Sequence, residues 1–155
     1  MGGGGPSLRK YRLTFDPYGL LVFLLIMIPN LVWFAVPAPD DILREESVTP
    51  VLDGIASACQ VLLVAALCAI ANRDRERLHL TPLTAASLCC GGLYAAGWAF
   101  YYAGFTGPPV ILLLALPPCL CFFFFALDRK NYIAVIPIAG FTVCHLIYSI
   151  VNFMT

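Results

Sequence analysis

The amino-acid sequence predicts an all-α integral membrane protein: a bundle of five transmembrane helices, with a cytoplasmic N-terminus and an external C-terminus. Three observations predict this fold. Of the 155 residues, 61% are hydrophobic and only 12% are charged, which is about half the charged fraction of an ordinary soluble domain. The chain contains five long apolar segments, and its basic residues gather on one side of a five-span topology. The composition excludes a water-soluble globular fold, and it excludes intrinsic disorder, which requires low hydrophobicity and high charge.

Each apolar segment supplies the roughly 20 residues needed to cross a hydrocarbon core of about 30 Å. The predicted spans are residues 17–36, 50–72, 82–103, 108–127 and 132–153. Lipid offers no partner to a free peptide group, and the segments lack the polar alternation of barrel strands, so each is predicted to be a helix. Residues 1–16 are predicted to form a flexible, basic N-terminal segment, and residues 17–155 a single transmembrane domain.

The first residues of three spans carry helix-start signals. The pairs are Asp16-Pro17, Thr49-Pro50 and Thr81-Pro82. In each pair, a side-chain oxygen can accept a hydrogen bond from a free amide of the first turn, and the proline has no amide to leave free. The pairs therefore predict three helix starts independently of hydropathy.

Basic residues predict the orientation of the chain. Eight of them fall before the first span, between the second and third, or between the fourth and fifth. These eight are Arg9, Lys10, Arg12, Arg73, Arg75, Arg77, Arg129 and Lys130. The other side holds only Arg44. Because short cytoplasmic loops are enriched in Lys and Arg, the N-terminus is predicted to be cytoplasmic and the C-terminus external.

The predicted external loop, residues 38–49, carries four acidic side chains: Asp40, Asp41, Glu45 and Glu46. Residues 40–46 are predicted to form a short helix with the apolar pair Ile42 and Leu43 on the membrane surface. One interpretation is a mouth or lid that attracts cations. The competing interpretation is a solvated acidic loop without a specific role.

Internal prolines predict bends. Pro29 lies past the middle of the first span, and Pro117-Pro118 lies near the middle of the fourth. Because a tandem pair removes two adjacent helix hydrogen bonds, it is predicted to divide the fourth helix into two parts.

Small residues recur on one face of the third span, at steps of four and three. The stripe comprises Ala85, Cys89, Gly92, Ala96, Ala99 and Ala103. Such a face allows a neighbouring backbone to approach, so it is predicted to pack against another helix rather than lipid. Tyr101 and Tyr102 are predicted to join an interfacial aromatic belt, whereas Tyr94 and Trp98 lie deeper and are candidates to line a pocket.

Polar side chains in the predicted outer half provide the one indication of function. Asp53, Ser57 and Gln60 share a face of the second span. His145, Ser149 and Asn152 share a face of the fifth span, beside Tyr148, and Asn30 follows Pro29 in the first. Polar side chains within a membrane normally face the bundle interior, so the two stripes are predicted to line one outward-facing cleft.

Two competing interpretations concern individual residues in these stripes. Asp53 is the fourth residue of its helix, where its charge favours the helix N-terminus. A single histidine in a span more often makes a structural hydrogen bond between helices than it catalyses a reaction.

The seven cysteines all lie inside predicted spans, and no Cys-x-x-Cys occurs. This distribution excludes a disulfide framework of the secreted kind and favours packing as small hydrophobic residues. The sequence lacks a phosphate-binding glycine loop, a His-Glu-x-x-His zinc motif and a Gly-x-Ser-x-Gly nucleophile motif. Neither a cofactor nor a metal is predicted, and the balanced charge predicts no binding to nucleic acid.

Five spans in a chain of this length resemble the outline of the translocator (tryptophan-rich sensory) proteins, although only Trp33 and Trp98 are present and no ligand follows from the outline. Residues 28–34 (IPNLVWF) and 128–132 (DRKNY) are similar to small uncharacterised polytopic membrane proteins of Gram-positive bacteria. That resemblance would cover most of the chain. It implies a bacterial cytoplasmic membrane location and supplies no activity.

The function expected from the sequence is binding or transport of a small amphipathic molecule in an outward-facing polar cleft. The candidate ligand-binding residues are Asn30, Asp53, Ser57, Gln60, Tyr94, Trp98, His145, Tyr148 and Ser149. One alternative is a non-catalytic partner or regulatory subunit that docks another membrane protein through the small-residue stripe; a homo-oligomer is a separate candidate assembly. Another is a membrane enzyme using His145 and Asp53, although no catalytic residue is assigned.

Overall fold

A computed structural model describes residues 10–74 and 79–154. Over these residues the chain forms five long helices, α1 (Pro17–Ala35), α2 (Pro50–Ala69), α3 (Pro82–Tyr102), α4 (Pro108–Asp128) and α5 (Tyr132–Phe153). All five are long and apolar enough to cross a membrane. The structure thus confirms the all-helical prediction and supports a multi-pass membrane protein. Residues 1–9 of the predicted flexible segment lie outside the described residues, and so do Arg75 and Arg77.

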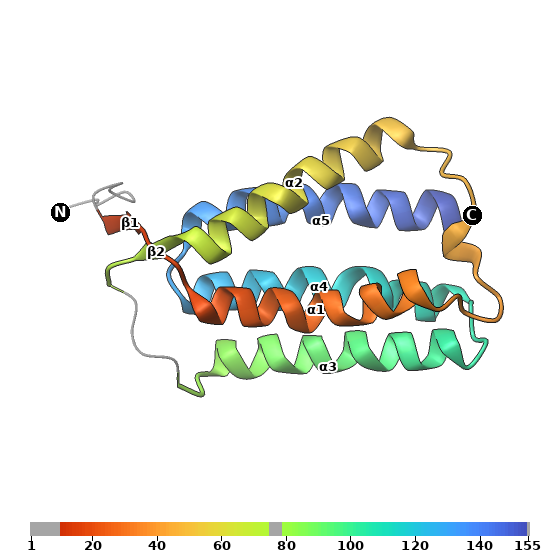
Figure 1. Cartoon of the computed structure of the whole chain (residues 1–155), viewed down its shortest axis with the longest axis horizontal. Coiled ribbons are helices and arrows are strands. Elements are labelled where there is room, and N and C mark those ends of the chain that lie inside the picture. Colours follow the sequence, from red (N-terminus) through yellow and green to blue (C-terminus); the bar gives the residue numbers. More distant parts are fainter. Residues whose placement is uncertain (1–9, 75–78, 155) are drawn as a thin grey trace.

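The helices run side by side along the long axis, and the start of α1 and the end of α5 lie at opposite ends of the bundle (Figure 1). α4 is the central helix and packs against both α3 and α5. Of an 18-residue apolar stretch in each helix, 61% is buried in α4 and 11% in α1. Large apolar side chains cover the outside of the helices, including Leu21, Ile28, Val61 and Ile136. Such a surface is suited to contact with lipid.

A two-stranded antiparallel sheet joins the N-terminal segment to the end of α2. β1 (Tyr11–Leu13) pairs with β2 (Ile70–Asn72) in the register Arg12 opposite Ala71. Residues 70–72 are therefore a strand rather than the predicted end of a helix, and residues 11–13 form a strand within the segment predicted to be flexible. The reason is a backbone ladder: the amide of Thr14 donates to the carbonyl of Ala69, and that of Asp16 to Cys68. The N-terminal segment thereby satisfies carbonyls that the end of a helix leaves free.

Helix starts agree with the proline pairs. Asp16 Oδ1 accepts a hydrogen bond from the amide of Tyr18 at 3.1 Å, and Thr81 Oγ1 accepts one from the amide of Thr84 at 3.0 Å. Thr49 departs from the prediction: its side chain caps no amide and instead donates to Asp53 Oδ1 at 3.2 Å. α2 therefore begins at the predicted proline without the predicted cap.

The predicted division of α4 is wrong. The helix continues through Pro117 and Pro118, both of which are buried. α3 and α5 pack on either side of α4, and such tertiary contacts hold the helical backbone where two of its own hydrogen bonds are absent.

The prediction for the small-residue stripe of α3 is also wrong within this chain. The stripe lies on the outer surface, and a Cβ added to Gly92 would meet no atom within 4 Å. The opposite face of α3 makes the close contacts: a Cβ at Gly91 would lie 3.1 Å from Leu25, and one at Gly97 would lie 3.0 Å from Leu113. Small residues occur on both faces, so spacing alone does not identify the packed one.

Candidate functional site

A cavity of about 550 Å³ lies among the five helices, and all nine candidate residues line it. Asn30 comes from α1, and Tyr94 and Trp98 come from α3. The remaining six come from α2 and α5: Asp53, Ser57, Gln60, His145, Tyr148 and Ser149. Residues that are far apart in sequence therefore surround one space.

The cavity exists because α1 and α2 diverge. Near the sheet, Gly19 approaches α2 so closely that an added Cβ would lie 2.2 Å from the carbonyl oxygen of Leu67. Toward the other end of the bundle, the two helices separate (Figure 1). The cavity lining on these two helices accordingly extends from Phe23 to Phe34 of α1 and from Asp53 to Val64 of α2, away from the contact at Gly19.

Most of the lining is apolar or aromatic. Its apolar members include Met27, Leu63, Ile111, Phe122 and Phe141. Small-molecule sites typically combine such a lining with a few polar groups that fix the orientation of the ligand. The arrangement suits a molecule with an apolar body and a polar head.

Asn30 connects α1 to α3 within the lining. Its Nδ2 donates to the carbonyl of Ile26 at 2.9 Å and to the hydroxyl of Tyr94 at 2.6 Å. The Tyr94 hydroxyl accepts this bond, so its own proton remains available to an acceptor in the cavity. Gln60 makes only a long contact, from Nε2 to the sulfur of Met27 at 3.9 Å.

Two ring nitrogen groups in the lining have no hydrogen-bond partner among the described residues. Trp98 is 6% exposed, and its indole N–H meets no acceptor. The imidazole of His145 makes no hydrogen bond and stacks between Phe141, at 5.0 Å between centroids, and Tyr148, at 6.3 Å. The structural hydrogen bond between helices that is commonest for a single membrane histidine is not observed for His145.

Other polar groups near the cavity are satisfied within the chain. The hydroxyl of Ser149 donates to the carbonyl of His145 at 2.8 Å. Asn152 belongs to the predicted stripe but does not line the cavity; its Oδ1 accepts from the amide of Val48 at 2.8 Å, and its Nδ2 donates to Thr49 Oγ1 at 2.9 Å. Asn152 therefore fastens the loop to α5.

The side chains considered for catalysis or metal binding are not grouped together among the described residues. No hydrogen bond joins His145 to Asp53 in the described part of the chain; the Asp53 carboxylate accepts from Thr49, and the His145 ring is held by stacking. Across residues 10–74 and 79–154, no three His, Cys, Asp or Glu residues form a group that could hold a metal ion. All seven cysteines are free thiols, located within the helices.

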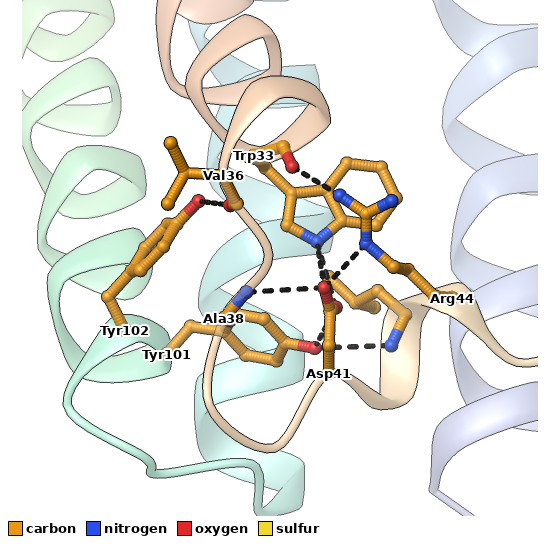
Figure 2. Close-up of polar contacts among 8 residues, drawn as sticks. Trp33, Val36, Ala38, Asp41, Arg44, Tyr101 and Tyr102 are labelled. Carbon is orange, nitrogen blue, oxygen red and sulfur yellow. Dashed lines mark hydrogen bonds and ion pairs between the residues drawn. The ribbon is translucent and has the colours of Figure 1, made fainter.

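Asp41 is the centre of a hydrogen-bond network at the loop end of the cavity (Figure 2). Its carboxylate accepts from the Trp33 indole at 2.8 Å, from the Tyr101 hydroxyl at 2.9 Å and from Arg44 Nε at 2.7 Å. A further bond comes from the amide of Ala38 at 3.3 Å. Burial by itself would raise the pKa of Asp41, but these hydrogen bonds outweigh it and hold the pKa below its usual value of 3.8.

The network corrects two expectations about the loop. The predicted short helix is a single 3₁₀ turn, Ile42–Arg44, and its apolar pair packs against the protein core rather than lying on the membrane surface. Leu43 lines the cavity, and its amide donates to the Tyr101 hydroxyl at 3.1 Å. Tyr101 is fully buried, so it does not belong to a lipid-facing belt.

Sequence reasoning did not single out Asp41, Leu43 or Tyr101 as residues of the site. Asp41 is one of four acidic residues in its loop, and the sequence does not distinguish it from Asp40, which is exposed. Its partners come from positions 33 and 101 as well as from the loop itself. No local pattern could have identified this carboxylate.

Comparison with known proteins adds nothing to the assignment: no family model, no curated protein and no solved structure is significantly similar to this chain.

Proposed function

We propose that this protein binds or transports a small amphipathic molecule in the cavity between its helices. The observation that carries the proposal is the meeting of nine polar and aromatic side chains, from four helices, around one space of about 550 Å³. The proposal places the protein in the bacterial cytoplasmic membrane, with the loop end of the cavity outside. The distribution of basic residues supports that orientation.

Two polar groups in the lining favour the binding of a ligand, because no described residue supplies a hydrogen-bond partner for them. A buried N–H without an acceptor costs roughly 1–3 kcal/mol. The Trp98 indole N–H has no acceptor, and the imidazole of His145 has no hydrogen bond, among the described residues. Water would supply those partners before a ligand binds, and the bound ligand would supply them after displacing that water.

Tryptophan fluorescence offers a direct test. Trp33 and Trp98 are the chain's two tryptophans, and both line the cavity. A bromine atom quenches indole fluorescence only at short range. We expect para-bromobenzyl alcohol, a neutral amphipathic probe, to quench the protein saturably in nanodiscs of zwitterionic lipid, in addition to the linear quenching caused by probe dissolved in lipid.

Variants identify the site of quenching. Gln60→Ala and His145→Ala should abolish the saturable component while helix content, measured by circular dichroism, stays unchanged. Leu88→Ala is a matched control, because Leu88 is exposed on the outer face of α3. Purely linear quenching in the wild type, or saturable quenching equal in all four proteins, would overturn the proposal.

A second candidate function is that of a non-catalytic partner subunit. It is favoured by the exposure of the small-residue stripe of α3, where the surface at Gly92 is open. Such a face permits another membrane helix to pack closely. Gly92→Leu should release a co-purifying membrane protein and leave the isolated bundle folded; co-purification unaffected by this substitution would count against this function.

A further inference from the structure

Asp53 differs from every other described residue of the cavity lining in its charge. The lining contains no other Asp or Glu, and no Lys or Arg. Asp53 lies in the first turn of α2, next to the loop, and is half-buried. The carboxylate of Asp53 therefore lies at the loop end of a largely apolar cavity.

No basic side chain of residues 10–74 and 79–154 pairs with this carboxylate. Among the described residues, its side-chain partner is the hydroxyl of Thr49, at 3.2 Å. Arg44, the one basic residue in the same loop, is held elsewhere: its Nε bonds Asp41 at 2.7 Å, and its terminal nitrogen bonds the carbonyl of Trp33 at 2.6 Å. A charged group in a membrane protein normally has a partner or serves a function.

Aromatic rings surround the same space. Trp98 lies 6.1 Å from Trp33 and 6.2 Å from Tyr94 between ring centroids, and Tyr148 stacks near His145. The face of an aromatic ring attracts cations. The protein already uses this attraction at Trp33, where the Arg44 guanidinium lies 4.8 Å from the ring centroid.

We propose that the amphipathic molecule bound in this cavity is a cation, of the lipophilic amine or quaternary ammonium class. Its positive head lies against Asp53 and the nearby aromatic rings, and its apolar body extends among the apolar side chains deeper in the cavity. This inference rests on the proposed binding function and adds the charge of the ligand. The charge preference is assigned to Asp53 because no other described residue of the lining is an Asp, Glu, Lys or Arg.

A purely structural role for Asp53 makes a different prediction. A carboxylate in the first turn of a helix stabilises that helix by about 0.3–1 kcal/mol. In that case, neutralising Asp53 would affect every ligand equally, through the fold. A cation site instead predicts that only positively charged ligands lose affinity.

The test compares two probes of the same shape. Para-bromobenzyltrimethylammonium is a cation, and para-bromoneopentylbenzene is its neutral carbon isostere; both report binding through quenching of Trp33 and Trp98. Asp53→Asn keeps the size of the side chain and an acceptor for the Thr49 hydroxyl. Glu46→Gln is the matched control, because it removes one negative charge from an exposed position of the loop that precedes α2.

The expected result is that Asp53→Asn weakens binding of the cation about tenfold, the effect of losing one partly screened charge pair. The affinity of Asp53→Asn for the neutral isostere should change by less than about twofold. Asp53→Glu should retain cation binding, and Glu46→Gln should leave the affinity for both probes unchanged. If Asp53→Asn weakens binding of both probes equally, or does not weaken binding of the cation, the charge preference is overturned and the proposed function stands. If neither probe quenches the wild type saturably, the charge preference and the proposed function are both overturned.

Discussion

The indole nitrogen of Trp33 lies 2.8 Å from Oδ1 and 3.0 Å from Oδ2 of Asp41, so one donor at the end of α1 holds the carboxylate of the following loop. Tyr101 of α3 donates to the same carboxylate and accepts from the amide of Leu43. Both Trp33 and Leu43 line the cavity. The bond between Trp33 and Asp41 therefore fixes the loop against the end of the cavity.

Replacing Asp41 by Ala should destabilise the protein by roughly 2–4 kcal/mol, because the substitution leaves the Trp33 indole and Tyr101 hydroxyl without their acceptor. The thermal unfolding midpoint in lipid nanodiscs measures this effect. Glu46→Ala removes an exposed acid from the same loop and should change stability by less than about 0.5 kcal/mol. Equal midpoints for the two variants would contradict the role of Asp41 as the centre of the network.

The stability of the folded protein should also depend on pH because of Asp41. Its pKa is lowered in the folded protein because the hydrogen bonds to the carboxylate outweigh the effect of burial. A group with a lowered folded pKa contributes stability that is fully present above its unfolded pKa and is lost as the pH falls through the folded pKa. The wild type should therefore lose more stability than Asp41→Asn between about pH 5 and about pH 3. Parallel profiles for the two proteins would refute this prediction.

Gly19 should tolerate no side chain. An added Cβ would lie 2.2 Å from the carbonyl oxygen of Leu67, a backbone atom that cannot move aside. Gly19→Ala is expected to cost about 1–3 kcal/mol, as overpacking does, and to change the angle between α1 and α2. Gly54→Ala is the control, since nothing lies within 4 Å of that position, and it should be neutral or slightly stabilising. Thermal unfolding of both variants tests the contact, which is excluded if Gly19→Ala unfolds like the wild type.

The ion pair between Arg129 and Asp16 should matter more than the one between Lys10 and Asp74. The first spans 3.4 Å with both side chains buried, and the second spans 3.1 Å with both more than half exposed. Removing one partner of a buried pair leaves the other charge uncompensated and typically costs about 3–5 kcal/mol, whereas an exposed pair contributes about 0–1 kcal/mol. Denaturation of Arg129→Gln and Lys10→Gln should show this difference, and equal losses would argue against it.

The proposed orientation predicts the behaviour of reporter fusions in a bacterial host. Green fluorescent protein should fluoresce when fused to the N-terminus, and alkaline phosphatase should be active when fused to the C-terminus. The reason is that an odd number of spans places the two ends on opposite sides, with the side richer in Lys and Arg in the cytoplasm. Fluorescence of green fluorescent protein fused to the C-terminus would reverse or remove the assignment of the outer end.

The number of long helices and the residue at which each begins could be predicted from the amino-acid sequence alone. Runs of about 20 apolar residues leave no alternative in lipid, and prolines mark the first residue of four helices, so all five starts could be predicted. The polar stripes also followed from helical periodicity, because residues three or four apart share a face. All nine candidate ligand-binding residues line the cavity, whereas Asn152 of the fifth-span stripe does not.

How the helices meet depends on contacts that the sequence does not reveal. The tertiary structure buries the glycine face of α3 and leaves the small-residue stripe outside, it keeps α4 continuous through Pro117-Pro118, and it selects Asp41 from four acidic residues as the acceptor of Trp33. It also ends α2 at Ala69, where the amides of Thr14 and Asp16 supply partners to the last carbonyls. Each of these outcomes depends on groups far apart in the chain, and hydropathy and periodicity record only the residues within one helix.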